Sequence, residues 1–254
     1  MADSTKISRG RRSFLKLSGV LGINALAAFV LPVEEADAFL FSKKEYKVSK
    51  TRLTMGTFVA MTAIHPSRDQ AEDAFGLAFD EINRLSGLLS RHAPDSPVSI
   101  LNTAGFLEDA PDELIEVVDR SLYFNGETGG CFDISVKPLL DLYQQCSEAG
   151  ISPHDSQIKE VLAWVDSRHL SVDGRKLSFA RENMGITLDG IGKGYIVDRA
   201  SDILKKNGIN NYLINAGGDI RTAGTAARGK KWTVAIQDPK KKGAYPDTHS
   251  YTHL

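Results

Sequence analysis

The stretch from Ser67 to Leu89 constrains the fold of this chain more than any other. Its apolar residues recur at intervals of three and four, which is the spacing of one face of a helix. These residues are Ala71, Ala74, Phe75, Ala78, Ile82, Leu85 and Leu89. Ser67 can cap the first turn with its hydroxyl group. The pattern therefore predicts one long helix with a single apolar face.

Shorter patterns along the chain predict strands and helices in an irregular order. Strands are predicted at Thr51 to Ile64, 184–188, 212–215 and 232–237, together with a hairpin over 170–179 that turns at Asp173-Gly174. Further helices are predicted to begin at Pro111, at Ser152-Pro153 and at Lys193, the last of them ending before Gly208. Because strands and helices do not alternate strictly, the pattern favours the α+β class.

Composition and charge exclude several classes of function. The chain has 254 residues, a formal net charge of -1, and Lys and Arg residues that are scattered rather than massed. We therefore expect no nucleic-acid partner. Two cysteines, Cys131 and Cys146, are too few for a disulfide scaffold or a cysteine-rich zinc site, and either one disulfide or two free thiols fits. The six histidines form no cluster typical of a metal site.

The first 38 residues carry the features of an export signal. Arg11 and Arg12 precede Ser-Phe-Leu-Lys and the apolar stretch 17–32, and Ala36-Asp37-Ala38 offers small residues where a signal peptidase cleaves. The paired arginines resemble a twin-arginine signal, which carries folded proteins across the membrane. We expect residues 1–38 to be this signal and 39–254 to be the exported domain. A retained N-terminal anchor is the alternative, although the apolar stretch is short for a membrane span.

Three stretches are richer in glycine and polar residues than packing requires. The first, 129–139, has paired glycines before Asp133, and it reads either as a ligand contact or as a turn that caps a helix. The second, 187–198, runs from a strand through Gly190, Gly192 and Gly194 into a helix, with Lys193 as a mobile cation. A helix start of this kind suits a phosphate or pyrophosphate, and a plain tight turn is the alternative.

The third stretch, 215–221, places Gly217-Gly218 between a strand and the pair Asp219 and Arg221. A turn with a local Asp–Arg ion pair explains it nearly as well as a binding site does.

Six segments taken together resemble the successive motifs of the FAD-dependent FMN transferase family, the ApbE-like flavin transferases. They are Met55-Gly56-Thr57, 94–102, 132–139, 188–198, 215–221 and 232–239, in the family's order. The resemblance covers about residues 48 to 239 and implies a flavin-transferase type of α+β fold, with mixed sheets and flanking helices. It also implies an enzyme that uses Mg²⁺ to cleave FAD, releases AMP, and attaches FMN through a phosphoester to a Thr or Ser of a membrane or periplasmic redox protein.

The resemblance also implies roles for individual residues. FAD-binding positions match Met55, His92, Cys131, Phe132, Asp133, Thr187 and Lys193. His92 stands where members often carry an aromatic ring, and Thr187 stands where they often carry an acid. The main-chain carbonyl of Gly190 matches a metal ligand, whereas no residue is assigned as the catalytic base or nucleophile.

Family members continue well beyond the Asp-Pro that corresponds to Asp238-Pro239, and that part supplies an Asp and a Thr as metal ligands. We therefore expect the domain at 39–254 to be incomplete at its C-terminus, and the chain as written to be unable to transfer FMN. Two alternatives to the transferase follow: an inactive FAD-binding relative in the periplasm that holds or delivers flavin, and an exported interaction protein whose glycine turns are structural.

Export through the paired arginines is directly testable. Changing both Arg11 and Arg12 to Lys keeps the charge but removes the twin-arginine feature, so unprocessed precursor should accumulate in the cytoplasm. Fractionation and immunoblotting of cells that express the tagged full chain measure this. Normal processing and export of the double-Lys chain would rule out the twin-arginine route.

Overall fold

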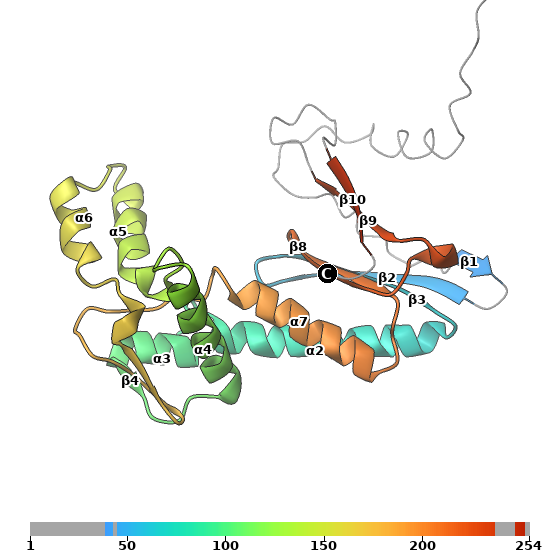
Figure 1. Ribbon diagram of the computed structural model, residues 1–254, viewed down its shortest axis with the longest axis horizontal. Helices are drawn as coiled ribbons and strands as arrows, with labels where there is room; N and C mark the ends of the chain where they lie inside the picture. Colours follow the sequence, from blue (N-terminus) through green and yellow to red (C-terminus); the bar gives the residue numbers. More distant parts are fainter. Residues whose placement is uncertain (1–38, 43–44, 237–246, 252–254) are drawn as a thin grey trace, which may run out of the picture. The chain divides into compact units, whose positions relative to one another are not determined.

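Antiparallel strands form the layer against which the long amphipathic helix packs. The computed structural model describes residues 39–42, 45–236 and 247–251, and side chains over 45–235. Among these residues the largest sheet has the strand order β1-β2-β3-β7-β8, and Figure 1 shows α2 and α7 along one side of it. Its strands are β1 Phe39–Ser42, β2 Glu45–Thr54, β3 Thr57–His65, β7 Tyr212–Ala216 and β8 Asp219–Ala223. All described residues belong to one compact unit that spans 32–254.

The remaining elements form a helical part, a small sheet and a strand pair. The helices are α2 Arg68–Leu89, α3 Pro97–Ala104, α4 Asp112–Glu127, α5 Lys137–Glu148, α6 Asp155–Leu162 and α7 Gly192–Lys206. Short 3-10 turns lie at Ile134–Val136, Ser167–His169 and Ala227–Gly229. A second sheet has the order β4-β6-β5, from β4 Phe106–Leu107, β6 Lys176–Phe179 and β5 Leu170–Asp173, and β9 Trp232–Ile236 pairs with β10 Asp247–Tyr251. Helices and antiparallel sheets together confirm the α+β class.

The long helix forms as predicted, and its apolar face covers the sheet. α2 spans Arg68–Leu89, and the Ser67 side chain accepts a hydrogen bond from the backbone N–H of Gln70 at 3.2 Å. Every residue of the predicted apolar face is buried. The second helix of this layer, α7, contacts α2 along its length and also contacts β7 and β8.

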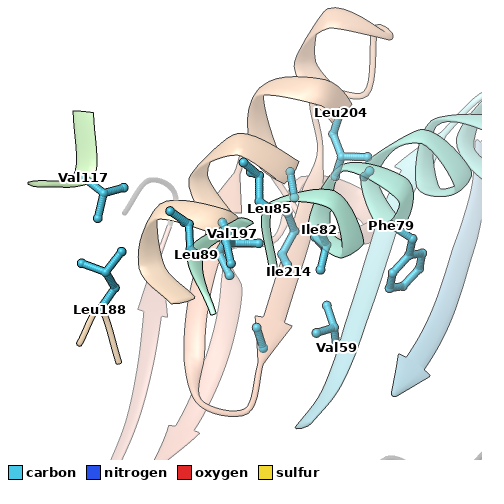
Figure 2. Close-up of a cluster of buried hydrophobic side chains, with 14 of the residues drawn as sticks. Val59, Phe79, Ile82, Leu85, Leu89, Val117, Leu188, Val197, Leu204 and Ile214 are labelled. Carbon is cyan, nitrogen blue, oxygen red and sulfur yellow. The ribbon is translucent and has the colours of Figure 1, made fainter. Parts of the chain in front are cut away.

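Side chains from two helices and two strands interlock between the helices and the sheet. Figure 2 shows this cluster, to which α2 contributes Phe79, Ile82 and Leu85, α7 contributes Val197 and Leu204, and the strands contribute Val59 and Ile214. Because these side chains are buried against one another, the apolar area they remove from water fixes α7 on the sheet. The start of α7, where the glycine-rich turn lies, is therefore held in a defined position relative to the ends of the strands.

Two of the predicted strands are wrong. The segment predicted as one strand from Thr51 to Ile64 is a hairpin, because Met55 and Gly56 both adopt positive φ (53° and 68°) and form a two-residue turn that pairs Thr54 with Thr57. Residues 184–188 form no strand. Instead the Asn102 side chain exchanges two hydrogen bonds with the backbone of Ile186, at 2.7 and 2.9 Å, which takes the place of a strand partner.

Other predictions hold with shifted bounds. The hairpin over 170–179 is confirmed, but its two-residue turn is Gly174-Arg175, because Asp173 pairs with Lys176. α7 begins one residue before Lys193 and ends before Gly208, whose φ of 80° suits the end of a helix. α4 begins after Pro111 and α6 after His154, whereas α3, α5 and β8 were not predicted.

Two sequence predictions lie outside the described residues. These are the export signal at 1–38 and the Asp238-Pro239 pair. Within the described part of the chain, no helix combines the length and apolar character needed to cross a membrane. Cys131 and Cys146 are free thiols, the first exposed and the second buried.

The packing of the central layer predicts a large loss of stability when a side chain between α2, α7 and the sheet is removed. Ile214 on β7 is fully buried in this cluster. Ile214→Ala should lower the free energy of unfolding by about 2–5 kcal/mol, and the control Ile214→Val by about 0.5–1.5 kcal/mol. Urea unfolding followed by circular dichroism measures both. Equal midpoints for the wild type and Ile214→Ala would contradict this packing.

Candidate functional site

The glycine-rich turn places an uncapped helix start at the surface of the central layer. The N-cap residue of α7 is Ile191, whose side chain makes no capping hydrogen bond, and the first turn contains no acidic residue. The turn itself is held by the carbonyl of Leu188, which accepts from the backbone N–H groups of Ile191 and Gly192 at 3.1 and 2.7 Å. The positive end of the helix dipole is thus left without a counter-charge from its own helix.

Lys193 adds a full positive charge at this helix start. A cation there costs about 0.3–1 kcal/mol, because the helix dipole favours anions at the N-terminus. The long helices α2 and α4 have the usual stabilising groups at their N-termini. Ser67 caps α2, and Asp112 and Glu113 lie in the first turn of α4. A positive side chain beside a positive helix end is the arrangement that binds an anion.

Two cavities meet at Lys193. The larger, of about 990 Å³, lies between α4 and the start of α7 and is lined by Gly190, Lys193, Arg120, Tyr123 and Phe124 among others. We call it the α4–α7 cleft. The smaller, of about 630 Å³, is lined by Met55, His92, Leu89 and Gly192 among others, and we call it the α2–α7 cavity. Asp189 and Lys193 line both cavities, and we call the place of this residue pair the junction of the cavities.

Both charged residues at this junction have partners from other elements. The Lys193 ammonium lies 2.9 Å from a carboxylate oxygen of Asp219, the first residue of β8. The Asp189 carboxylate lies 2.9 Å from the Nε of Arg91, which follows α2. Lys193 and Asp219 keep side-chain exposures of 43% and 42%, so the ammonium remains accessible to a ligand from solvent.

A tight turn fixes Asp219 at the end of the sheet. Gly217 and Gly218 have φ of 61° and 106°, and the Gly218 N–H donates to the Asn215 side chain at 3.0 Å. A Cβ at Gly217 would lie 2.4 Å from Oγ1 of Thr57, so only glycine allows this approach between the two hairpins. Asp219 and Arg221 do not form the local ion pair considered above, since Arg221 pairs instead with Asp198 at 3.2 Å.

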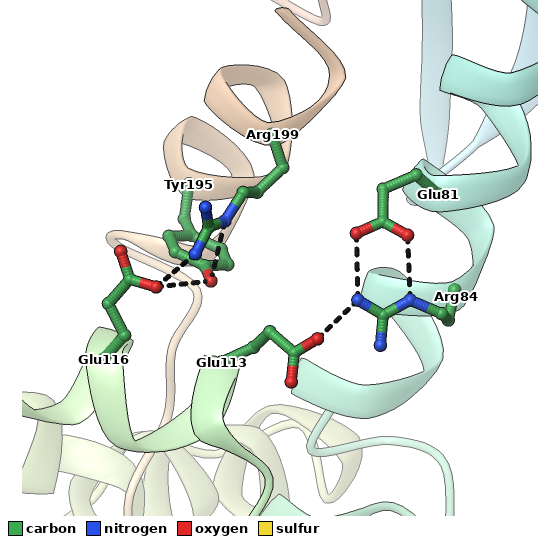
Figure 3. Close-up of polar contacts among 6 residues, drawn as sticks. All are labelled: Glu81, Arg84, Glu113, Glu116, Tyr195 and Arg199. Atoms are coloured by element: carbon green, nitrogen blue, oxygen red, sulfur yellow. Dashed lines mark hydrogen bonds and ion pairs between the residues drawn. The ribbon is translucent and has the colours of Figure 1, made fainter. Parts of the chain in front are cut away.

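Polar contacts hold the wall of the α4–α7 cleft together (Figure 3). The Tyr195 hydroxyl donates to Glu116 at 3.0 Å, and Arg199 contacts both the Tyr195 oxygen and the Glu116 carboxylate. Burial raises the pKa of Tyr195, which keeps its hydroxyl protonated as a donor at neutral pH. These contacts tie α4 to α7.

A second set of contacts ties α2 to α4. Arg84 on α2 bridges Glu81 at 2.8 Å and Glu113 of α4 at 2.5 Å. The pKa of Glu113 is lowered, first by a bond from its own backbone N–H and then by Arg84. The carboxylate therefore stays charged and keeps this link at neutral pH.

The structure brings five of the sequence-predicted site residues to the same place. Met55, at the β2–β3 turn, and His92 line the α2–α7 cavity together with Lys193. Gly190 lines the α4–α7 cleft next to Lys193. The Phe132 ring packs against Gly190, where an added Cβ would lie 3.2 Å from the ring. Phe132 also meets Phe124 edge to face, with centroids 6.3 Å apart, so the 129–139 stretch does reach the cleft.

The other three predicted residues lie differently. Cys131 is exposed, next to Phe132. Thr187 is buried, and its hydroxyl accepts from the backbone N–H of Asp189 at 3.2 Å, so it shapes the approach to the turn. Asp133 lines a separate cavity of about 470 Å³ with Asp166 and Arg168.

Hydrogen bonds within the protein use both carboxylate oxygens of Asp133. One oxygen accepts from the backbone N–H and the hydroxyl of Ser135, at 2.8 and 2.6 Å. The other accepts from Asn125 at 3.2 Å and from the backbone N–H of Ser167 at 3.1 Å. In this structure Asp133 therefore caps the 3-10 turn at Ile134–Val136, which was the alternative reading of the 129–139 stretch.

Sequence reasoning missed an aromatic and basic row on α4. The Arg120 guanidinium lies 5.3 Å from the centre of the Tyr123 ring and 5.1 Å from that of Phe124, and all three line the α4–α7 cleft. Their spacing of three and four residues puts them on one helical face. This spacing can be read from the sequence, since these three residues form a face separate from the apolar face of Leu114, Val117 and Val118.

The described residues do not make a complete divalent-metal site. Among them there is no group of three or more His, Cys, Asp and Glu side chains that could hold a metal ion. Of the five acidic residues that line the α4–α7 cleft with Gly190, Asp189 and Asp219 are each paired with a cationic side chain. Mg²⁺ prefers near-octahedral oxygen coordination, and a single carbonyl oxygen from Gly190 does not supply it.

The fold is that of the flavin transferases among solved structures. The chain belongs to the ApbE family, whose profile matches residues 55–253. Two solved structures align well. The flavin transferase ApbE from Vibrio cholerae has a TM-score of 0.66 and 26% identity, over 77% of this chain and 65% of that one. Apo flavinyl transferase ApbE from Pseudomonas stutzeri has a TM-score of 0.67 and 27% identity, over 76% and 61%.

Curated relatives carry the name FAD:protein FMN transferase. The one from Vibrio cholerae is 32% identical over 167 residues, which are 63% of this chain and 50% of the relative. The one from Escherichia coli K12 is 30% identical over 166 residues, which are 61% of this chain and 46% of the relative. The chain thus spans about half the length of these relatives.

Proposed function

We propose that this chain binds FAD at the junction of its two cavities and belongs to a protein that transfers the FMN part to a hydroxyl group of a partner protein. The observation that carries the proposal is that Lys193 lines both cavities at an uncapped helix start. FAD has a planar ring system at each end and a pyrophosphate between them. A ligand of this form fits two adjoining cavities with a positive centre at their junction. The names of the relatives support the same substrate and a protein acceptor.

The proposed reaction exchanges the phosphoanhydride bond of FAD for a phosphoester bond. The acceptor hydroxyl oxygen, from a Thr or Ser, forms a bond to the phosphorus that carries riboflavin. The bond from that phosphorus to the bridging oxygen breaks, AMP leaves with the bridging oxygen, and the hydroxyl proton is released. Negative charge grows on the departing phosphate, and Lys193 together with the α7 dipole would stabilise it. The aromatic rings that line the cleft, Tyr123 and Phe124, would shield the reacting groups from water.

Magnesium stays a prediction of the family resemblance. It would neutralise phosphate charge if bound, but the described residues do not complete a site for it, so no step above depends on it. The export of the chain and the membrane or periplasmic nature of its acceptor are also proposed, on the basis of the paired arginines Arg11 and Arg12.

One experiment separates binding from transfer. The purified chain is incubated with FAD, Mg²⁺ and an acceptor domain that carries a Thr in a flavin-attachment segment, and FAD binding is followed by flavin fluorescence. Intact-mass spectrometry of the acceptor reports transfer as the addition of one FMN less one water. Because the described residues complete no metal site, the chain as written should bind FAD without transfer, whereas a version extended by a family-like C-terminal part should transfer. Binding without transfer in the extended version would favour the FAD-holding relative, and absence of binding would contradict the proposed function.

A matched pair of variants locates the site. Lys193→Ala should weaken FAD binding by about 1–3 kcal/mol, because it removes a charge-assisted contact. Lys176→Ala is the control, since Lys176 is similarly exposed (45% against 43%) and is likewise paired with a carboxylate, that of Glu108 at 2.7 Å, but lies on the small sheet. The control should bind FAD like the wild type. Equal losses of FAD affinity in the two variants would contradict a binding site at the junction of the cavities.

A further inference from the structure

The pairing of Lys193 with Asp219 suggests a role that the family resemblance does not assign. Asp219 comes from a different element, the first residue of β8, and is placed there by the Gly217-Gly218 turn. Its carboxylate lies 2.9 Å from the Lys193 ammonium in the α4–α7 cleft. It thus supplies the counter-charge that the first turn of α7 lacks.

We propose that Asp219 is a positioning residue that holds the Lys193 ammonium at the junction of the cavities and competes with the incoming phosphate for it. This inference rests on the proposed function, because it concerns the same site. A lysine ammonium has three donors on a flexible stem, and a carboxylate held by a rigid turn restricts where that stem points. The same negative charge lies close to where an anionic ligand would bind, so it weakens the binding of that anion.

The geometry excludes a purely local role for Asp219. It is not paired with Arg221 two residues away, since Arg221 contacts Asp198 on α7 instead. Both partners of the Lys193–Asp219 pair are also about 40% exposed, so the pair is not part of the packed core. An exposed ion pair contributes little to folding, which points to an effect on the ligand rather than on stability.

The test is a double-mutant cycle on FAD affinity in the full chain, without added divalent metal. Asp219→Asn keeps the side-chain shape and removes the charge. It should tighten FAD binding roughly two- to five-fold, the range of an exposed ion pair. Asp219→Glu, which restores the carboxylate, should return the affinity toward that of the wild type. In the Lys193→Ala background, Asp219→Asn should no longer tighten binding, because the competition acts through the ammonium.

The dependence of FAD affinity on salt concentration is a second measurement, and it would not change if Asp219 had only a structural role. Asp219→Asn leaves Lys193 without its counter-charge, so FAD affinity should fall more steeply with NaCl concentration than in the wild type. Glu108→Gln is the matched control, since it breaks a comparable Lys–carboxylate pair, with Lys176, outside the cleft. It should leave both the affinity and its salt dependence unchanged.

The outcomes separate this inference from the proposed function. If Lys193→Ala does not weaken FAD binding, the proposed binding site itself is wrong. If Lys193→Ala weakens binding but Asp219→Asn leaves it unchanged or weaker, the site stands and the competition by Asp219 is overturned. An equal gain from Asp219→Asn with and without Lys193 would also overturn it, because the effect would then be a general loss of negative charge.

Discussion

The apolar contact between α7, α2 and the central sheet is the interaction on which the rest of this structure depends. α7 carries an unfavourable start, with no capping side chain, no acid in its first turn and a lysine at its second residue. Its buried face, which includes Val197 and Leu204, compensates by removing apolar surface from water against α2 and the sheet. The helix can therefore keep an N-terminus that lacks a capping side chain and carries an unfavourable charge.

Three turns then converge on this helix start. The β2–β3 turn brings Met55, the β7–β8 turn brings Asp219, and the glycine-rich turn brings Gly190 and Lys193. The close approach of Gly217 to Thr57 shows that two of these turns constrain each other through their backbones. On the other side, α4 is tied to α7 by Glu116, and it carries the aromatic wall of the larger cleft. The two cavities are thus formed where these turns, the start of α7 and α4 come together.

Local sequence patterns predicted helices and strands such as α2. Contacts between residues far apart in the sequence determined the features that these patterns did not reveal. α2 was predictable because its capping residue and apolar face lie within one stretch of sequence. The β2–β3 turn was missed because Met55-Gly56 is not a typical turn pair and the strand-like pattern continues through it. Residues 184–188 look like a strand, but the backbone of Ile186 is bonded to Asn102, which lies 84 residues earlier. The glycine turn and Lys193 could be predicted, whereas the pairing of Lys193 with Asp219 depends on tertiary packing.

A structure of the chain with FAD bound tests the central claim most directly. The account predicts pyrophosphate oxygens within hydrogen-bond distance of the Lys193 ammonium and of backbone N–H groups at the start of α7, with one ring system in each of the two cavities. FAD bound elsewhere, or bound with its pyrophosphate away from Lys193, would contradict the account.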